Sequence, residues 1–203
     1  MGAATGMLLE TAEQLGYEVY GVEIGNASVD VLRNKFGFEH VFHGWFDQME
    51  IECCGGAEFF DLVTMVDVLE HVRNPNNTLN QISKVLKKGG LVACYIPNTS
   101  SWAAKILGSR WEFYCTPHLF AFSARNLKAL FEKHGFDVLA SYPSPRYLSI
   151  EYARNVIQYE LHGGLGELML PILKRVPKFL ARLIMPCYVG NLTIIVQKND
   201  DHT

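Results

Sequence analysis

The sequence predicts an α/β fold with a doubly wound, mostly parallel sheet and helices on both faces. Residues 1–24 contain a glycine-rich stretch, an apolar-periodic run and a Val/Tyr-rich stretch, the order of loop, helix and strand in a nucleotide-binding unit. Residues 59–66 form a nearly continuous apolar run, which is typical of a strand buried on both faces of a parallel sheet. A helical pattern and a second apolar run at 91–96 follow, and together they predict a right-handed parallel crossover.

The composition is that of one folded domain, or of one domain with a modest appendage. The chain has 203 residues, of which 49% are hydrophobic and 19% charged, so it can bury a sizeable core. Its formal net charge of −3 argues against a general nucleic-acid binder. No uncharged apolar run reaches the length of about 18 residues that a membrane span needs, and we expect no signal peptide.

The cysteines indicate the redox environment. Five cysteines stand at positions 53, 54, 94, 115 and 187. Their odd number argues against a disulfide framework, and their spacing is not that of a zinc site. We therefore expect a reducing cytoplasm. His40 and His43 are close in the sequence, but nothing near them completes a three-ligand set, so we expect no metal.

The first stretch holds candidates for a ligand site. Gly2 and Gly6 permit a tight turn with close backbone approach, and the amides at the start of the next helix favour an anionic or polar group. Glu23, about 20 residues after the first glycine, stands where an acid accepts the hydroxyls of a ribose. An ordinary helix–strand connection with a solvated Glu23 is the alternative interpretation.

The other elements follow from apolar periodicity and from capping residues. We expect helices between Gly6 and Gly16, between Asn26 or Ser28 and Gly37, between Thr78 and Lys87, and between Ser123 and Gly135. A weak helical pattern covers 100–108. Strands are expected at 17–23, 40–43, 59–66, 91–96, 136–141 and 192–197. The apolar face of the first helix is expected to hold Leu8, Ala12 and Leu15.

Residues 142–190 are the irregular part of the chain. One amphipathic helix is indicated by Ile150, Ala153, Ile157 and Leu161. A second segment at 165–186 is interrupted by two prolines and is basic and apolar, with Lys174, Arg175, Lys178 and Arg182. Such a segment is suited to a membrane surface or to a pocket for a greasy substrate; helices that cover a sheet face are the alternative. We thus divide the chain into a core (1–141), a helical insertion or cap (142–190) and the last strand of the core sheet (191–199).

Several motifs in order along the chain resemble the class I S-adenosylmethionine-dependent methyltransferases, close to the branch that acts on quinone precursors, sugars and other small molecules. Besides the glycine loop with Glu23, they are Phe60-Asp-Leu-Val-Thr-Met-Val-Asp-Val-Leu-Glu-His71, Val85-Leu-Lys-Lys-Gly-Gly90, Ile96-Pro-Asn98, His118-Leu-Phe-Ala-Phe-Ser123 and His134-Gly-Phe136. The resemblance runs to the final strand at Gly190-Asn-Leu-Thr-Ile. It implies a Rossmann-like sheet and S-adenosylmethionine as the cofactor.

The resemblance also implies which residues bind the cofactor. Gly2, Ala4 and Gly6 match the glycine loop that approaches the methionine part, with Ala4 where a glycine is commoner. Glu23 matches the ribose-binding acid, and Ile24 would pack against the adenine.

Three further cofactor positions follow two later strands. Asp47 resembles the acid near the adenine amino group, although a loop acid next to a core Trp45 is an equal alternative. Val66 and Asp67 resemble the end of the strand that flanks the sulfonium.

Methyl transfer to a small-molecule hydroxyl needs a base of near-neutral pKa, and histidine is the usual residue. His118, in an aromatic-rich loop at 110–122, and His71, after the apolar run, are the candidates. A structural or capping role is the alternative for each. The acceptor is expected to be small, with a lipid-like one favoured by the segment at 165–186. The oligomeric state is left open.

One part of the family pattern is absent. A central first strand precedes the glycine loop in the family, yet here only Met1 precedes Gly2. We therefore hypothesise that the chain is an N-terminally truncated form of a longer protein. A non-catalytic remnant that does not bind the cofactor is the second hypothesis. An NAD-dependent dehydrogenase is the third, although its usual Gly-x-Gly-x-x-Gly spacing is not present.

Overall fold

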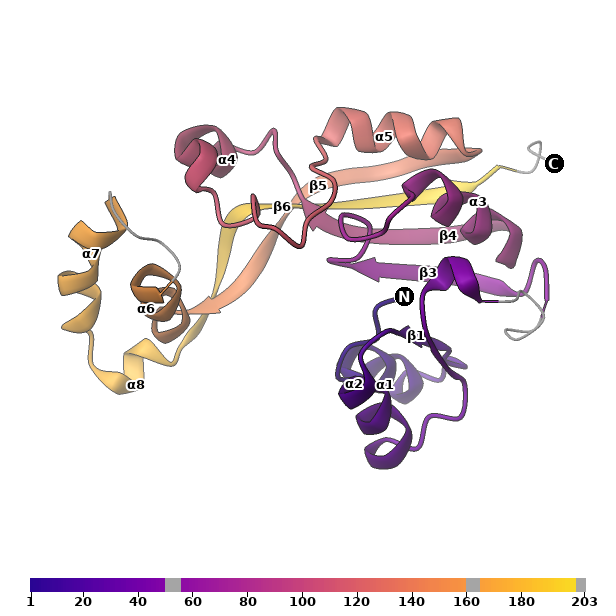
Figure 1. Cartoon of the computed structure of the whole chain (residues 1–203), viewed down its shortest axis with the longest axis horizontal. Helices are drawn as coiled ribbons and strands as arrows, with labels where there is room; N and C mark the ends of the chain where they lie inside the picture. Colours follow the sequence, from indigo (N-terminus) through magenta and orange to yellow (C-terminus); the bar gives the residue numbers. More distant parts are fainter. Residues whose placement is uncertain (50–55, 160–164, 200–203) are drawn as a thin grey trace.

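The strands of the computed structural model, which describes residues 1–49, 56–159 and 165–199, form two sheets (Figure 1). The smaller sheet pairs β1 (Gly21–Glu23) with β2 (Val41–His43) in parallel. The larger sheet has the order β3 (Phe60–Val66), β4 (Leu86–Pro97), β6 (Ile184–Lys198), β5 (Phe136–Ser149). The β3–β4 pair is parallel and the other two pairs are antiparallel. The predicted α/β class is confirmed.

The predicted strand–helix–strand crossover is formed by β3, α3 (Pro75–Val85) and β4. The helix begins three residues earlier than expected, because the Asn74 side chain accepts from the amide of Asn77 and Pro75 occupies the first turn. It also ends earlier, at Val85. Residues 86–90 form the start of β4 instead. The register of its pairing with β3 shifts between Phe60 and Leu62.

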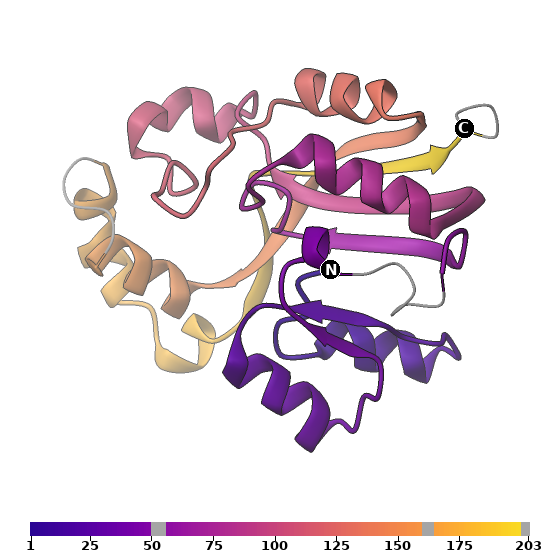
Figure 2. The same cartoon turned by 45° about the vertical axis from the view of Figure 1, so that its right-hand side comes forward.

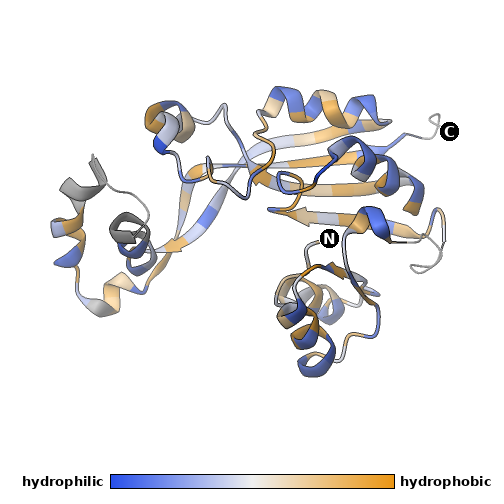
Figure 3. Cartoon of the chain, in the orientation of Figure 1, coloured by the Kyte–Doolittle hydropathy of each residue, from blue (hydrophilic) through white to orange (hydrophobic). Residues whose placement is uncertain are grey.

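One face of the larger sheet is covered by α3 and α5 (Ala124–Lys133), which lie side by side above it (Figure 2). The Ser123 side chain caps α5 as expected and forms a capping box with Asn126. The main hydrophobic core lies between these helices and the sheet, and its fully buried side chains include Met65, Leu79, Ile82, Leu127, Phe131 and Ile194. Figure 3 shows hydrophobic residues along β3 and β4 and residues of both kinds on α5. The apolar face of α5 thus packs against the sheet, as the amphipathic pattern predicts.

The prediction that residues 59–66 are buried on both faces is wrong. Val63 and Met65 face the core under α3 and α5, but Leu62 is 43% exposed and Val66 is 48% exposed. In the described part of the chain, the two helices cover only the face on which Val63 and Met65 lie. The exposed end of β3 is therefore free to form part of a cavity wall.

The first five elements of the chain pack around a second, smaller core. α1 (Met7–Gln14), α2 (Asn26–Asp30) and the π-helical turn η1 (Val31–Lys35) lie beside β1 and β2. Val29, Leu32, Phe38 and Val41 are its buried residues. The predicted apolar face of α1 does not pack: Leu8 and Leu15 are exposed, whereas Leu9 packs against this core.

The strands β5 and β6 are longer than predicted and extend away from the sheet as a two-stranded ribbon (Figure 1). The predicted strands at 136–141 and 192–197 are only their sheet-bound parts. The ribbon carries α6 (Ile150–Tyr159), α7 (Leu165–Lys174) and α8 (Lys178–Ala181) at its far end. The side chain of Arg154 donates to the backbone oxygens of Leu173 and Val176, which connects α6 to the end of α7. Leu161 lies outside the described residues, and the division of the chain at 142 and 190 stays a prediction.

The glycine loop connects the two sheets. The amino group of Met1 donates to the oxygen of Thr64 on β3 (2.8 Å), and the amide of Ala3 donates to Val22 on β1 (3.1 Å). The loop turns through left-handed conformations at Ala4 (φ 47°) and Gly6 (φ 89°). A strand ahead of the loop, as hypothesised from the sequence, stays a prediction.

The loop predicts opposite effects of two substitutions. Ala4→Gly should raise the free energy of unfolding by up to about 1 kcal/mol, because a left-handed alanine costs about 1–2 kcal/mol and glycine's extra chain entropy offsets only part of this. Gly6→Ala should lower it, since the new Cβ would lie 2.8 Å from Cδ2 of Leu32. Urea unfolding monitored by circular dichroism measures both. A destabilised Ala4→Gly variant would contradict the assigned strain.

Candidate functional site

A cavity of about 740 Å³ opens where β1, β2 and β3 end. Its wall contains Glu23 at the end of β1, Ile24 directly after it, and residues that follow β2 (44–48) and β3 (67–68), together with the glycine loop. Ligands of open α/β sheets bind at the carboxyl ends of the strands, where the loops converge. The cavity therefore has the position of a ligand site.

Most of the sequence-predicted residues meet at this cavity. The cavity wall includes Gly2, Ala4, Glu23, Ile24, Asp47, Val66, Asp67 and His71. Two predicted residues do not line it. Gly6 is buried against Leu32 under the loop, and His118 lies beside His71 with a ring distance of 4.6 Å.

Glu23 holds the glycine loop and the start of the next turn. Its Oε2 accepts from the amide of Ala4 (2.7 Å), and its Oε1 accepts from the amides of Ile24 (3.0 Å) and Gly25 (2.8 Å). A carboxylate has about four acceptor positions. Three are used by the backbone, so one is left. The alternative of a solvated Glu23 does not describe this arrangement.

The rest of the wall combines apolar and polar groups. Ile24 and Val66 are about half exposed, into a cavity that they both line. Trp45 is half-buried and lies under the guanidinium of Arg73, 5.4 Å from the ring centre. Phe46, not Trp45, is the core residue of that turn. Arg73 could not be identified from the sequence, because only the tertiary structure brings the turn after β3 over the turn after β2.

Asp67 ends β3 in an unusual conformation. Its φ of 50° is left-handed, and its Oδ1 is buried without a hydrogen-bond partner in the described structure. Burial raises the pKa of this carboxyl above its ordinary value, and Arg146 opposes part of the shift. Strained residues of this kind concentrate at functional sites. The geometry thus agrees with a ligand-contacting position.

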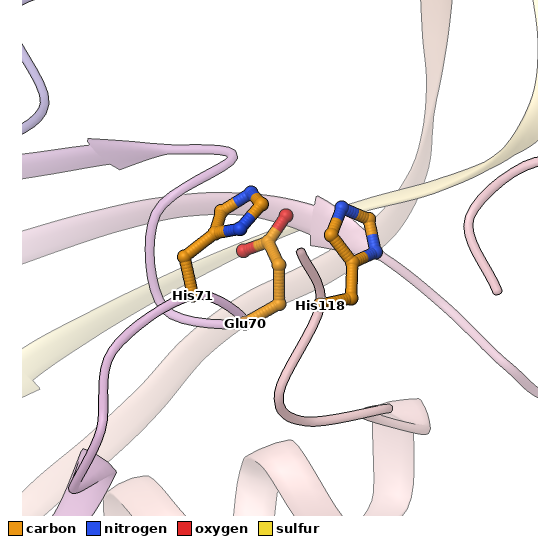
Figure 4. A group of neighbouring side chains, drawn as sticks. All are labelled: Glu70, His71 and His118. Carbon is orange, nitrogen blue, oxygen red and sulfur yellow. The ribbon is translucent and has the colours of Figure 1, made fainter. Parts of the chain in front are cut away.

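Glu70, His71 and His118 form a compact group beside the cavity. One potential ligand atom from each residue lies within 4.8 Å of the other two. Figure 4 shows the Glu70 carboxylate between the two imidazole rings. Glu70 is 1% exposed, and neither carboxylate oxygen has a hydrogen-bond partner in the described structure.

The loop at 110–122 is docked onto this group by backbone contacts. The amides of Leu119 and Phe120 both donate to the backbone carbonyl oxygen of Glu70 (2.9 and 3.1 Å). Nδ1 of His71 lies 2.9 Å from the backbone oxygen of Pro117. Both histidines were predicted from the sequence as separate candidates. Nothing in the sequence indicated that they are in contact, because 47 positions separate them. Glu70 was missed as a site residue, since its burial is visible only in the tertiary structure.

The surroundings shift the pKa values of two members of the group. Burial raises the pKa of Glu70 to about 7. The interaction of the carboxylate with its own backbone amide opposes the shift, and the nearby charge of Asp67 adds to it. Burial also lowers the pKa of His118 below its ordinary value of 6.5. His118 is therefore mostly neutral at pH 7, with a lone pair available.

Within the described residues, no helix has the length and apolarity that a membrane span requires.

The curated relatives are methyltransferases of quinone synthesis. The chain is 32% identical over 117 residues to the ubiquinone biosynthesis O-methyltransferase of Maricaulis maris. This alignment covers 55% of this chain and 45% of the relative. The protein of the same name from Pasteurella multocida is 27% identical over 130 residues, or 58% of this chain and 53% of the relative. The chain thus spans about half the length of the curated relatives that it matches.

Solved structures share the fold at low sequence identity. A methyltransferase from Haloferax volcanii, described in complex with the activator Trm112, aligns with a TM-score of 0.67 and 15% identity and covers 98% of this chain and 80% of that one. An S-adenosylmethionine-dependent methyltransferase from Thermotoga maritima aligns with a TM-score of 0.60 and 19% identity, over the same shares of the two chains.

The family model of a methyltransferase domain matches residues 1–141. This match sets aside the dehydrogenase hypothesis and confirms the predicted family, with S-adenosylmethionine as its cofactor. The chain belongs to the class I S-adenosylmethionine-dependent methyltransferase domains.

Proposed function

We propose that this protein moves a methyl group from S-adenosylmethionine to a hydroxyl of a small-molecule acceptor. The observation that carries the proposal is one cavity that holds both the matched cofactor residues and His71. The curated relatives are named O-methyltransferases, which supports an oxygen acceptor. A cytoplasmic location stays a prediction.

The residues of the cavity fit the cofactor in charge and shape. The left-handed turn at residues 2–6 keeps side chains away from a ligand that approaches the loop. The free acceptor position of Glu23 suits a ribose hydroxyl, and Ile24 provides an apolar surface for a flat base. Asp47 is exposed at the same wall, where it would accept from an amino group. We also propose that Gly2 approaches the methionine part of the cofactor and that Val66 and Asp67 flank the sulfonium.

When bound, S-adenosylmethionine would supply an activated methyl group for transfer to the acceptor oxygen. The protein's part is to align the acceptor behind the methyl and to promote loss of the hydroxyl proton to solvent. We assign this second task to the Glu70–His71–His118 group, because His71 lines the cavity and His118 is in ring contact with it.

Cofactor binding should be visible as a stabilisation of the folded chain. S-adenosylmethionine at a hundredfold excess over its dissociation constant should stabilise the chain by about 2.7 kcal/mol, visible as a rise in Tm. Asp47→Asn should reduce the rise, whereas Glu39→Gln, an exposed acid outside the cavity wall, should leave it unchanged. A cooperative transition that S-adenosylmethionine does not shift would favour the hypothesis of a remnant without cofactor binding.

Turnover should depend on His118. His118→Ala should lower the rate of methyl transfer, measured with catechol as the probe acceptor, far more than it lowers cofactor affinity. In the unaltered protein the rate should rise with pH through a pKa below 6.5, because His118 must lose its proton and burial lowers its pKa. His134→Ala, in a histidine bonded to Asn76 and Asn80, is the matched control. Equal losses of turnover and cofactor binding would indicate a folding defect and not a role in transfer.

We also propose that residues 165–186 make peripheral contact with a membrane and that the acceptor is lipid-like. The end of the ribbon exposes large apolar side chains at Ile172, Phe179 and Ile184 next to the exposed cations Lys174 and Arg175. The alternative of helices that cover a sheet face is disfavoured, because α7 and α8 lie at the far end of the ribbon (Figure 1). Apolar side chains flanked by cations suit an interface with anionic lipid.

Flotation with anionic phospholipid vesicles at low salt tests this contact. The protein should float with the vesicles, and the double variant Ile172→Ser/Phe179→Ser should bind them at least several-fold less. Ile106→Ser, which removes an equally exposed side chain from α4 (Trp102–Leu107), should bind as the unaltered protein does. Absence of binding at low salt would remove the proposal.

A further inference from the structure

We propose that Arg146 is a positioning residue for methyl transfer, because it holds the loop at 110–122 in the place where His118 contacts His71. Arg146 lies on β5, in the part that forms the ribbon with β6 (Figure 1). It follows the residues that match the family model, which end at 141. The inference rests on the proposed function, since it concerns the histidines to which we assign loss of the hydroxyl proton.

A continuous stack of side chains leads from Arg146 to the cavity. The guanidinium carbon of Arg146 lies over the ring of Phe113, 5.4 Å from its centre. The rings of Phe113 and His118 are nearly parallel, at 12°, with their centres 6.2 Å apart. His118 then meets the ring of His71 edge-on at 4.6 Å, and His71 lines the cavity. These are distances at which cations and aromatic rings attract one another. Arg146 is not part of the described cavity wall, so it would act through these rings and not by contact with the acceptor.

The backbone of Phe113 also holds the His118 ring. The carbonyl oxygen of Phe113 lies 2.7 Å from Nδ1 of His118. A carbonyl oxygen only accepts, so Nδ1 must carry the hydrogen, and Nε2 of the neutral ring keeps the lone pair. The position of Phe113 therefore determines both the orientation of the His118 ring and its tautomer. A residue that fixes Phe113 fixes the imidazole as well.

Charge connects Arg146 to two other segments. Its Nη1 forms an ion pair with Oε1 of Glu112 at 3.6 Å, and its positive charge also acts on the carboxyl of Asp67 at the end of β3. The side chains of Arg146 and Glu112 are only 33% and 22% exposed, so solvent screens this pair less than a pair on an open surface. One guanidinium thus attracts both the loop and the end of β3 toward the ribbon.

The ribbon holds the beginning of the loop through a second contact. Nε1 of the buried Trp111 donates to the backbone oxygen of Val189 on β6 (3.1 Å). Gly190 permits this close approach, since a Cβ there would lie 2.9 Å from Cζ2 of Trp111. Because Trp111 stays attached without Arg146, we expect Arg146→Ala to loosen the loop locally around Phe113 and to leave the fold intact.

Histidine NMR of the full chain, without cofactor or acceptor, tests the positioning role. In protein with ¹⁵N-labelled histidine, at a pH where the ring is neutral, long-range ¹H–¹⁵N spectra distinguish a fixed Nδ1–H tautomer from an exchanging one. His118→Ala identifies the signals of His118, which should show the hydrogen on Nδ1 in the unaltered protein. Arg146→Ala should shift these signals toward those of an unconstrained imidazole. Lys128→Ala, which removes an ion pair of the same 3.6 Å length on α5, should leave them unchanged.

A milder substitution separates the two contacts of Arg146. Arg146→Lys keeps the charge opposite Glu112 but lacks the planar group over Phe113. We expect it to shift the His118 signals in the same direction as Arg146→Ala, by a smaller amount. Circular dichroism and thermal unfolding verify that each variant is folded.

Turnover with catechol as the probe acceptor is the second measurement. Arg146→Ala should lower kcat by about fivefold or more and change the KM for S-adenosylmethionine by less than about twofold, because it displaces His118 and not the cofactor residues. In the His118→Ala background the same substitution should have little further effect, because the imidazole that it displaces is already absent.

The two measurements separate failure of this proposal from failure of the proposed function. His118 signals that stay unchanged in folded Arg146→Ala and Arg146→Lys overturn the positioning role, and so does an equal loss of turnover in both backgrounds. Absence of methyl transfer by the unaltered protein contradicts the proposed function, whereas the histidine spectra still decide whether Arg146 positions His118.

Discussion

The parallel pairing of β3 with β4 is the constraint on which the site depends. The register aligns Val63 with Val92 and Val66 with Tyr95, so β3 ends where Asp67 donates its amide to the oxygen of Tyr95. The chain must then turn sharply. A parallel partner can be reached only through a crossover, so the residues between β3 and α3 lie over the ends of the strands. Asp67, Glu70 and His71 all belong to that turn.

Buried polar groups concentrate around the same turn. Asp67 and Glu70 both have buried oxygens without partners in the described structure, although the core directly beneath them is apolar. Such groups lower stability, so their retention calls for an explanation such as a role toward a ligand or in a reaction. The turn is therefore best understood as a place where stability is given up for chemistry, with the surrounding core of α3 and α5 holding it in position.

The opposite part of the site is held by a different device. Glu23 connects the glycine loop, the end of β1 and the turn after it through three backbone amides. The loop in turn contacts β3 through Met1. Glu23 and the amino group of Met1 thus together connect the small sheet to the large one through the glycine loop.

The sequence by itself determined the class of the fold, the positions of most elements and the cofactor side of the site. Local signals suffice for these: apolar periodicity predicts helices and strands, and the glycine loop with Glu23 at the end of β1 is contiguous in the chain. It did not determine the reach of β5 and β6 beyond the sheet, because a two-stranded ribbon shows no clear burial pattern. Nor did it indicate that α1 leaves Leu8 and Leu15 exposed. Only the tertiary structure decided that Glu70 is buried without a partner between His71 and His118, because the docking of a loop 47 residues further along the chain depends on long-range packing.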